Sequence, residues 1–231
     1  MKMKLTIDDN TVSSENQVSE TDRFKPYLVA GATKKIAIVG NSITLHNPLP
    51  SIGWSGAWGM AASCAENDFC HIIMREVREK YPDTSFAIVQ GADWERNFWE
   101  QPENYNDQFR RLEAFDPDII VFRLGENSSR ELCAEHDFAK GFMTLCDHFS
   151  NGGKRKLLIT ETFWASPWTE NGLRMAAEKY CGNIIPLCDL GEKDEMKALG
   201  LFEHHGVSIH PGDLGMKAIA ERILEKLYKI I

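Results

Sequence analysis

The stretch KIAIVGNSIT, residues 35–44, joins a run of apolar residues to a polar Gly-Asn-Ser tip. A run that is apolar at nearly every position, instead of at alternate positions, is typical of a strand buried on both faces of a parallel sheet. Ser42 follows the carboxyl end of this predicted strand. In open α/β sheets ligands bind at that edge, because the strand-to-helix loops converge there on helix N-termini. The stretch therefore predicts a parallel sheet with Ser42 at its ligand-binding edge.

Strand and helix patterns alternate along the rest of the chain. Four more apolar runs predict strands over residues 86–90, 118–124, 156–160 and 183–188. Apolar residues at helical spacing predict helices over residues 66–81, 138–149, 173–180 and 215–231. A possible capping box, formed by Ser63 and Glu66, lies at the start of the first of these helices. This alternation predicts an α/β fold, a three-layer α/β/α sandwich around a five-stranded parallel sheet.

The length of the chain fits a single domain. A chain of 231 residues is within the usual size of one α/β domain, which we expect over residues 23–231. Residues 1–22 are polar and rich in Ser, Thr, Asn and acidic residues. Such a composition predicts a flexible N-terminal lead or the trimmed end of a longer protein.

Four short segments occur in one order along the chain. They are Gly40-Asn41-Ser42, Gly91, Gly125-Glu126-Asn127 and His210-Pro211, and each of the first three lies at the carboxyl end of a predicted strand. This order resembles that of the SGNH/GDSL hydrolases, whose four blocks carry a serine, a glycine, an asparagine and a histidine. The resemblance covers residues 34–231, with Asn41 in place of the family's usual Asp. It implies a flavodoxin-like sheet with the strand order 2-1-3-4-5.

The resemblance also implies catalytic roles. Ser42 would be the nucleophile and His210 the general base, while the N–H of Gly91 and the side-chain amide of Asn127 would join the Ser42 N–H as oxyanion donors. These residue types suit the chemistry, because a serine hydroxyl is a poor nucleophile until a base removes its proton. The tetrahedral intermediate also places negative charge on an oxygen, which preorganised donors must stabilise.

One position departs from the family's pattern. The family places an Asp three residues before the His, and this chain has Val207 there. That acid normally orients the imidazole and stabilises the imidazolium. A backbone carbonyl near Val207 or a carboxylate from Glu203, Asp213 or Asp189 could replace it, and we expect a Ser-His dyad assisted by a carbonyl. The alternative is a decayed site on a protein that only binds its ligand.

All six tryptophans lie in three predicted loop segments, residues 44–60, 92–101 and 161–168. Aromatic side chains beside an active site can stack on sugar faces or enclose an acyl chain. We therefore predict that Trp54, Trp58, Trp94 and Trp164 bind substrate, the alternative being that they pack the loops onto the sheet. A long apolar segment of the kind that could form a lid is absent from the sequence, which argues against a lipase acting on aggregated fat.

Composition limits the partners and the compartment. A net charge of −8 and a pI near 5.4 argue against nucleic acid, because a phosphate backbone calls for a clustered basic face. No window approaches the roughly 20 apolar residues that span a bilayer. The N-terminus turns acidic before any apolar core forms, so the sequence as written has no signal peptide. We expect a cytoplasmic protein, or an exported one if an upstream signal was trimmed.

The sequence predicts neither a metal nor an organic cofactor. Its six cysteines contain no C-x-x-C pair, which argues against a metal site formed by spacing. Neither a G-x-G-x-x-G segment after the first strand nor a Walker lysine motif is present.

These observations combine into one leading hypothesis. It is a serine esterase that hydrolyses a small acyl ester, an acetyl ester, on a carbohydrate through an acyl-serine intermediate. The alternatives are a lipid ester or thioester hydrolase, and a non-catalytic carbohydrate-binding protein on a degraded hydrolase scaffold.

Overall fold

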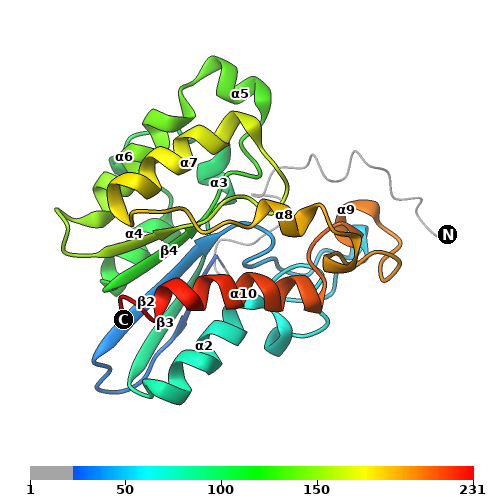
Figure 1. Ribbon diagram of the computed structural model, residues 1–231, viewed down its shortest axis with the longest axis horizontal. Coiled ribbons are helices and arrows are strands. Elements are labelled where there is room, and N and C mark those ends of the chain that lie inside the picture. The colour runs from blue at the N-terminus through cyan, green and yellow to red at the C-terminus, as the bar shows by residue number, and fades with distance from the viewer. Residues whose placement is uncertain (1–22) are drawn as a thin grey trace.

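The computed structural model describes residues 23–231, and its centre is a five-stranded sheet (Figure 1). The order across the sheet is β1-β3-β2-β4-β5. The strands are β1 (Phe24–Tyr27), β2 (Lys34–Gly40), β3 (Thr84–Gln90), β4 (Ile119–Arg123) and β5 (Lys156–Ile159). All neighbours are parallel except β1, which pairs antiparallel with β3. The predicted flexible lead over residues 1–22 lies outside the described residues.

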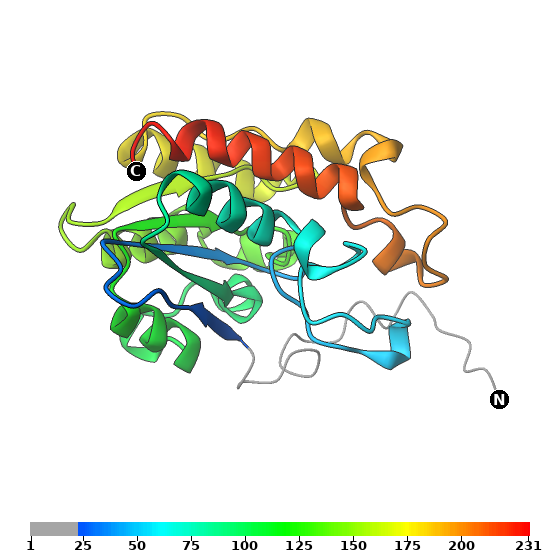
Figure 2. The same ribbon diagram turned by 90° about the horizontal axis from the view of Figure 1, so that it is seen from below.

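Helices cover both faces of the sheet, so the predicted α/β class with three layers is confirmed (Figures 1 and 2). Ile36 and Ile38 of β2 face one hydrophobic cluster, with the helices over residues 69–80 and 213–227. Ala37 and Val39 face the other cluster, with the helices over residues 107–115, 138–150 and 167–180. This follows from the alternation of side chains along a strand. The covering helices are α2 (Phe69–Lys80), α4 (Asp107–Phe115), α6 (Phe138–Ser150), α7 (Pro167–Tyr180) and α10 (Asp213–Leu227).

Shorter helical segments occupy the connections. The α-helical ones are α3 (Ala92–Arg96), α5 (Arg130–Glu135), α8 (Cys188–Gly191) and α9 (His205–Ser208). The 3-10 turns are η3 (Pro50–Ile52), η4 (Ala65–Asn67), η5 (Pro102–Asn104) and η6 (Asp194–Met196). Two of these segments, α3 and α9, carry residues of the candidate site. Among the described residues, no helix combines the length and apolar character needed to cross a membrane.

The strand order differs from the expected 2-1-3-4-5 at both edges of the sheet. The predicted strand over residues 183–188 forms only an isolated bridge, between Thr160 and Ile185. Pro186 has no N–H for a ladder, and the N–H groups of Leu187 and Cys188 donate to the Glu161 carboxylate. At the opposite edge, β1 adds a strand that the sequence pattern did not predict.

The expected start of the helix over residues 66–81 is also corrected. Helix α2 begins at Phe69, and the buried carboxylate of Asp68 caps it by accepting a hydrogen bond from the N–H of His71. Ser63, expected in a capping box with Glu66, instead donates through its N–H and its hydroxyl to Asp213. This contact joins the loop before α2 to the first turn of α10.

Candidate active site

Ser42 and His210 meet beyond the carboxyl end of β2. Ser42 Oγ lies 2.9 Å from His210 Nε2, although the two residues are 168 positions apart. His210 Nδ1 lies 2.6 Å from the carbonyl oxygen of Gly206, at the turn of α9. Because a carbonyl only accepts hydrogen bonds, Nδ1 carries the proton and Nε2 of the neutral ring is left to accept from Ser42. The geometry is that of a serine with an oriented base.

The surroundings keep this base neutral. Loss of solvation lowers the pKa of His210 to about 3, and the hydrogen bond to Gly206 partly opposes this shift. His46, which follows Ser42 by four residues, lies on the same cavity wall with Nδ1 2.6 Å from the carbonyl of Asn47. Burial lowers the pKa of His46 to about 4. Both imidazoles are therefore unprotonated near pH 7.

Within residues 23–231, no carboxylate takes the place beside His210 that an Asp has in the SGNH/GDSL pattern. Val207 is fully buried in an apolar cluster that includes Ile52, Trp54 and Met60. Of the expected substitutes, Asp213 accepts hydrogen bonds from Ser63 and Asn67, Asp189 binds Arg222 and Lys193, and Glu203 is exposed. The group that holds His210 Nδ1 is the carbonyl of the residue before Val207.

Asn127 reaches the same cavity and is held at both ends of its amide. Its Nδ2 donates to Glu95 Oε2 at 2.6 Å, and its Oδ1 accepts from Arg96 Nη2 at 3.1 Å. One of the two amide N–H groups suffices for the bond to Glu95, so the other can serve a substrate oxygen. Glu95 and Arg96 are consecutive residues of α3. The position of the Asn127 amide is thus set by a helix that follows a different strand.

The expected role of Gly91 needs correction. Its N–H donates to the carbonyl of Gly40 at 2.6 Å, which continues the parallel ladder of β2 and β3 by one residue. Gly91 is buried and does not line the cavity around Ser42. In this structure its N–H is not available as an oxyanion donor.

A buried hydrogen-bond network surrounds Asn41, the residue before Ser42. Asn41, next to Ser42, donates through Nδ2 to Glu95 Oε1 at 3.1 Å and to Glu126 Oε2 at 2.7 Å. Its Oδ1 accepts from Arg123, which also pairs with Glu126. Burial, and secondarily the charge of Glu126, raise the pKa of Glu95. Glu95 is not predictable from the sequence, because nothing in its local pattern distinguishes it from a solvated helix residue.

Only one of the four predicted tryptophans reaches the cavity. The ring centroid of Trp164 lies 5.0 Å from that of His210, edge to face. Trp54 and Trp94 are each 3% exposed and pack in hydrophobic clusters. Trp58 packs edge to face on Trp54 and donates to the carbonyl of Ala62 at 2.9 Å. The prediction of substrate contact is therefore corrected for these three residues. Trp94 packs in the cluster that covers the sheet, whereas Trp54 and Trp58 pack among the loops around Val207.

The cavity around Ser42 is small. It encloses about 160 Å³. The residues that line it are Ser42, His46, Ile52, Met60, Gln90, Ala92, Arg96, Glu126, Asn127, Trp164, Gly206, Ile209 and His210. In the part of the chain that the structure describes, no three His, Cys, Asp or Glu side chains are grouped so that they could hold a metal ion.

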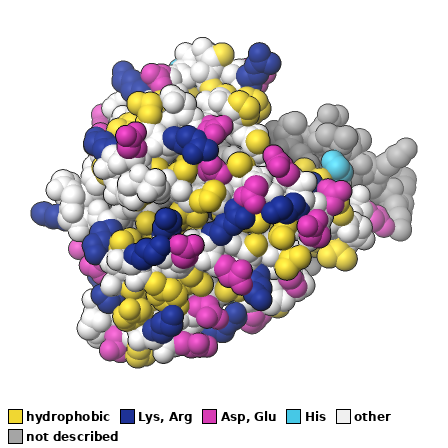
Figure 3. Space-filling view, in the orientation of Figure 1, with side chains coloured by type: hydrophobic (Ala, Val, Ile, Leu, Met, Phe, Trp, Pro, Cys, Tyr) yellow, Lys and Arg dark blue, Asp and Glu magenta, His cyan; other side chains and the backbone are white. Residues whose placement is uncertain are grey.

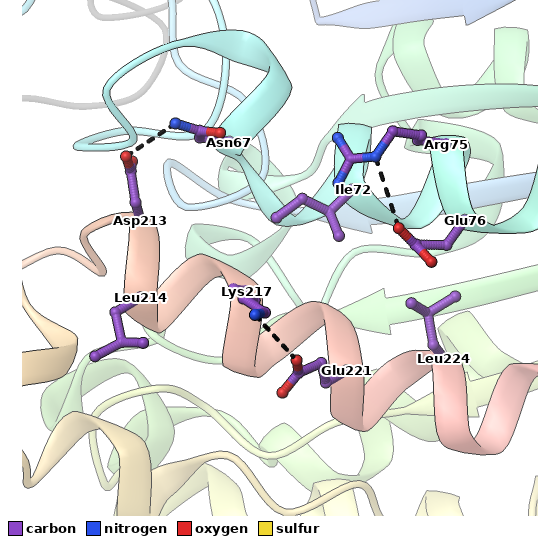
Figure 4. A pocket seen from close by; sticks show the side chains of 9 residues that line it. All are labelled: Asn67, Ile72, Arg75, Glu76, Asp213, Leu214, Lys217, Glu221 and Leu224. Carbon is purple, nitrogen blue, oxygen red and sulfur yellow. Dashed lines mark hydrogen bonds and ion pairs between the residues drawn. The ribbon is translucent and has the colours of Figure 1, made fainter.

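A larger cavity of about 610 Å³ lies elsewhere, between α2 and α10 (Figure 4). Ion pairs flank it on both helices, Arg75–Glu76 at 3.6 Å and Lys217–Glu221 at 3.8 Å. Apolar side chains are exposed between these helices among acidic and basic ones (Figure 3). This larger cavity shares no lining residue with the cavity around Ser42.

The fold has solved relatives of low sequence identity. A psychrotrophic esterase, EstA from Pseudoalteromonas sp., matches with a TM-score of 0.53 and 12% identity over 85% of this chain and 97% of that chain. A two-domain esterase active on acetylated mannans matches with a TM-score of 0.54 and 15% identity over 87% of this chain and 51% of that chain. A protein described as a GDSL-like lipase from Bacteroides ovatus matches with a TM-score of 0.53 and 16% identity over 85% of this chain and 98% of that chain.

The sequence by itself matches no protein-family model and no curated protein. The similarity is therefore one of architecture, carried by the sheet, its covering helices and their connections. On this architecture, the chain has the fold of the SGNH/GDSL hydrolases.

Proposed function

We propose that the protein is a serine esterase that removes a small acyl group, an acetyl group, from a carbohydrate or a related alcohol. The observation that carries the proposal is the 2.9 Å contact of Ser42 Oγ with His210 Nε2, in a ring whose tautomer is set by the Gly206 carbonyl. A neutral imidazole in hydrogen-bond contact with a serine is the arrangement that activates a nucleophile.

The reaction follows from these positions. Ser42 Oγ attacks the ester carbonyl carbon while His210 Nε2 takes its proton, which gives a tetrahedral intermediate with a negatively charged oxygen. The Ser42 N–H and the second amide N–H of Asn127 stabilise that oxygen. His210 then returns the proton to the departing alcohol, leaving an acyl-serine. A water molecule, deprotonated by His210, then attacks the acyl-serine and forms a second tetrahedral intermediate. When this intermediate collapses, His210 returns the proton to Ser42 Oγ and the acid is released.

The size and wall of the cavity support a short acyl group. A space of about 160 Å³ accommodates an acetyl group, whereas a long acyl chain would have to lie outside it. Trp164 offers an aromatic face beside His210 of the kind that packs on sugar rings. The mannan esterase among the structural relatives acts on acetylated sugars, which is consistent with such a substrate. A GDSL-like lipase is also among the structural relatives, so our preference for a short acyl group over a lipid ester rests on the small cavity.

Hydrolysis of p-nitrophenyl acetate, butyrate and octanoate by the wild type, Ser42→Ala and His210→Ala tests the proposal. We expect activity that is greatest on the acetate and is lost in both variants. Labelling by a fluorophosphonate probe gives a second test, because it depends on an activated serine and not on the correct alcohol. Absence of both hydrolysis and labelling in the wild type would favour a carbohydrate-binding protein instead.

A further inference from the structure

Arg96 brings a positive charge to the wall of the Ser42 cavity. It ends helix α3, and its guanidinium donates to the carbonyl of Ala92 at 3.3 Å and to Asn127 Oδ1 at 3.1 Å. A guanidinium has five N–H groups in a planar fork, and these two contacts use two of them. Arg96 therefore retains hydrogen-bonding capacity on a wall that it shares with the nucleophile.

The charge of Arg96 has no direct counterpart. Among residues 23–231, no carboxylate oxygen lies within 4.0 Å of its guanidinium nitrogens. Burial lowers its pKa, as expected for a charged group that has lost solvent. The charge of Glu95 partly opposes this shift. A half-buried guanidinium without a direct ion pair still loses solvation, so its position beside Ser42 calls for a reason.

The nearby carboxylates are committed to other donors. Glu126 accepts from Arg123 and from the N–H of Phe163 through Oε1, and from Asn41 through Oε2. Glu95 accepts from Asn41, from the N–H of Gly125 and from Asn127. Arg123 pairs with Glu126, and Glu95 is the acidic group whose charge acts on Arg96. Because both carboxylates accept from other donors, the remaining N–H groups of Arg96 are left for a ligand in the cavity.

We infer that Arg96 binds a carboxylate of the substrate, so that the esters hydrolysed here carry a carboxylate close to the scissile bond, as an acetylated acidic sugar does. The planar fork of a guanidinium matches a carboxylate, and such charge-assisted bonds are about twice as strong as neutral ones. A neutral ester would leave the remaining N–H groups of Arg96 without a charged acceptor. With a net charge of −8, the chain as a whole repels anions, so selection of one requires a local cation.

The inference rests on the proposed esterase function, and paired esters separate the two. One pair is 4-acetoxybenzoate and its methyl ester, which places the carboxylate on the alcohol side. The other is p-nitrophenyl hemisuccinate and p-nitrophenyl butyrate, which places it on the acyl side. The measured quantity is the ratio of kcat/KM for the anionic ester to that for the neutral ester, taken within each protein. If a substitution at Arg96 also displaces the Asn127 amide, kcat/KM falls for both esters and the ratio does not change.

We expect the wild type to favour the anionic ester in at least one pair, and Arg96→Met to lower that ratio by about ten- to a hundredfold. Arg96→Lys, which keeps the charge and loses the fork, should fall between them. Arg75→Met is the matched control, since it removes an exposed arginine from α2. An equal fall with Arg75→Met would indicate a long-range charge effect and overturn the inference.

Ratios that Arg96→Met leaves unchanged in both pairs would also overturn the inference, while hydrolysis of the neutral esters would still uphold the esterase. No turnover of any ester would instead count against the proposed function. Calorimetric binding of benzoate to Ser42→Ala, compared with Ser42→Ala/Arg96→Met, then tests the site without turnover. Binding lost in the double variant supports a carboxylate site, and equal or absent binding in both contradicts it.

Discussion

The carbonyl oxygen of Gly206 lies 2.6 Å from His210 Nδ1, where a serine hydrolase ordinarily has a carboxylate. A carbonyl can fix the tautomer of the ring as a carboxylate does. It brings no full negative charge, so it stabilises the imidazolium less. The site is thus built to keep His210 neutral in its resting state, and this has a consequence for the pH dependence of the reaction.

The acid limb of the pH profile should lie well below the ordinary range of histidine. In the folded protein the pKa of His210 is lowered from 6.5 to about 3, so the active neutral ring is present above that value and is protonated only as pH falls through it. We expect kcat/KM for p-nitrophenyl acetate to stay nearly level from pH 7 to pH 5. Circular dichroism at each pH separates titration from unfolding. A half-loss of activity near pH 6.5 in the folded protein would contradict the assignment.

Replacing Asn127 should affect turnover more than binding. Asn127→Ala removes a donor that acts on the charge developing in the transition state, and such losses cost about a hundred- to a thousandfold in kcat. We expect KM for p-nitrophenyl acetate to change by only a few fold. Asn127→Asp, which retains size and loses the N–H groups, should be impaired similarly. A change confined to KM would indicate that the amide only binds substrate.

Introducing at position 41 the Asp of the SGNH/GDSL pattern should destabilise this protein. The amide of Asn41 donates to both Glu95 and Glu126, and an Asp there would place a third carboxylate against two others. We expect Asn41→Asp to lower the free energy of unfolding by about 3 kcal/mol. The deficit should shrink as pH falls and the carboxylates become protonated. Urea unfolding at pH 7 and pH 5, with exposed Asn104→Asp as the control, measures it.

Introducing at position 207 the Asp of the SGNH/GDSL pattern should not create a triad. The Val207 side chain is fully buried with Ile52, Trp54 and Met60, so an Asp there would bury an unpaired charge in an apolar cluster. We expect Val207→Asp to lower Tm and kcat together, and Val207→Asn, equal in size and uncharged, to be less harmful. An increase in kcat in a stable Val207→Asp protein would show that the carboxylate reaches His210.

Replacing Trp94 and Trp164 should distinguish a residue that packs the core from one that contacts substrate. Trp94 is buried against Phe98, Phe138 and Phe142. We expect Trp94→Ala to lower the free energy of unfolding by about 3–5 kcal/mol. Trp164→Ala should cost less stability and should change KM, because the ring faces the cavity beside His210. Trp168→Ala, which removes a more exposed ring, is the control for Trp164. Equal effects of all three on KM would contradict this division.

The features of the site that the sequence predicts are those that depend on residues close together along the chain. The apolar runs before Ser42 and Gly125-Glu126-Asn127 are local patterns, and local patterns suffice to predict buried strands and the loop residues at their carboxyl ends. The failure at residues 183–188 is local too, since Pro186 limits pairing in an otherwise apolar run. Strand β1 was missed for a different reason, because its four residues acquire a partner only when β3 lies beside them.

By itself, the sequence determined the α/β class and the loop residues at the strand ends, because hydrophobic periodicity and strand ends depend only on neighbouring residues. Only the tertiary structure decided the rest of the site. In it the carbonyl of Gly206 contacts His210 Nδ1 where an Asp was expected, and the N–H of Gly91 donates to Gly40. Trp54 and Trp94 are buried instead of lining the cavity. The tertiary structure also joined Asn41 to Glu95 across 54 positions. Hydrogen bonds and burial between residues so far apart exist only once the sheet has assembled, so no local pattern can specify them.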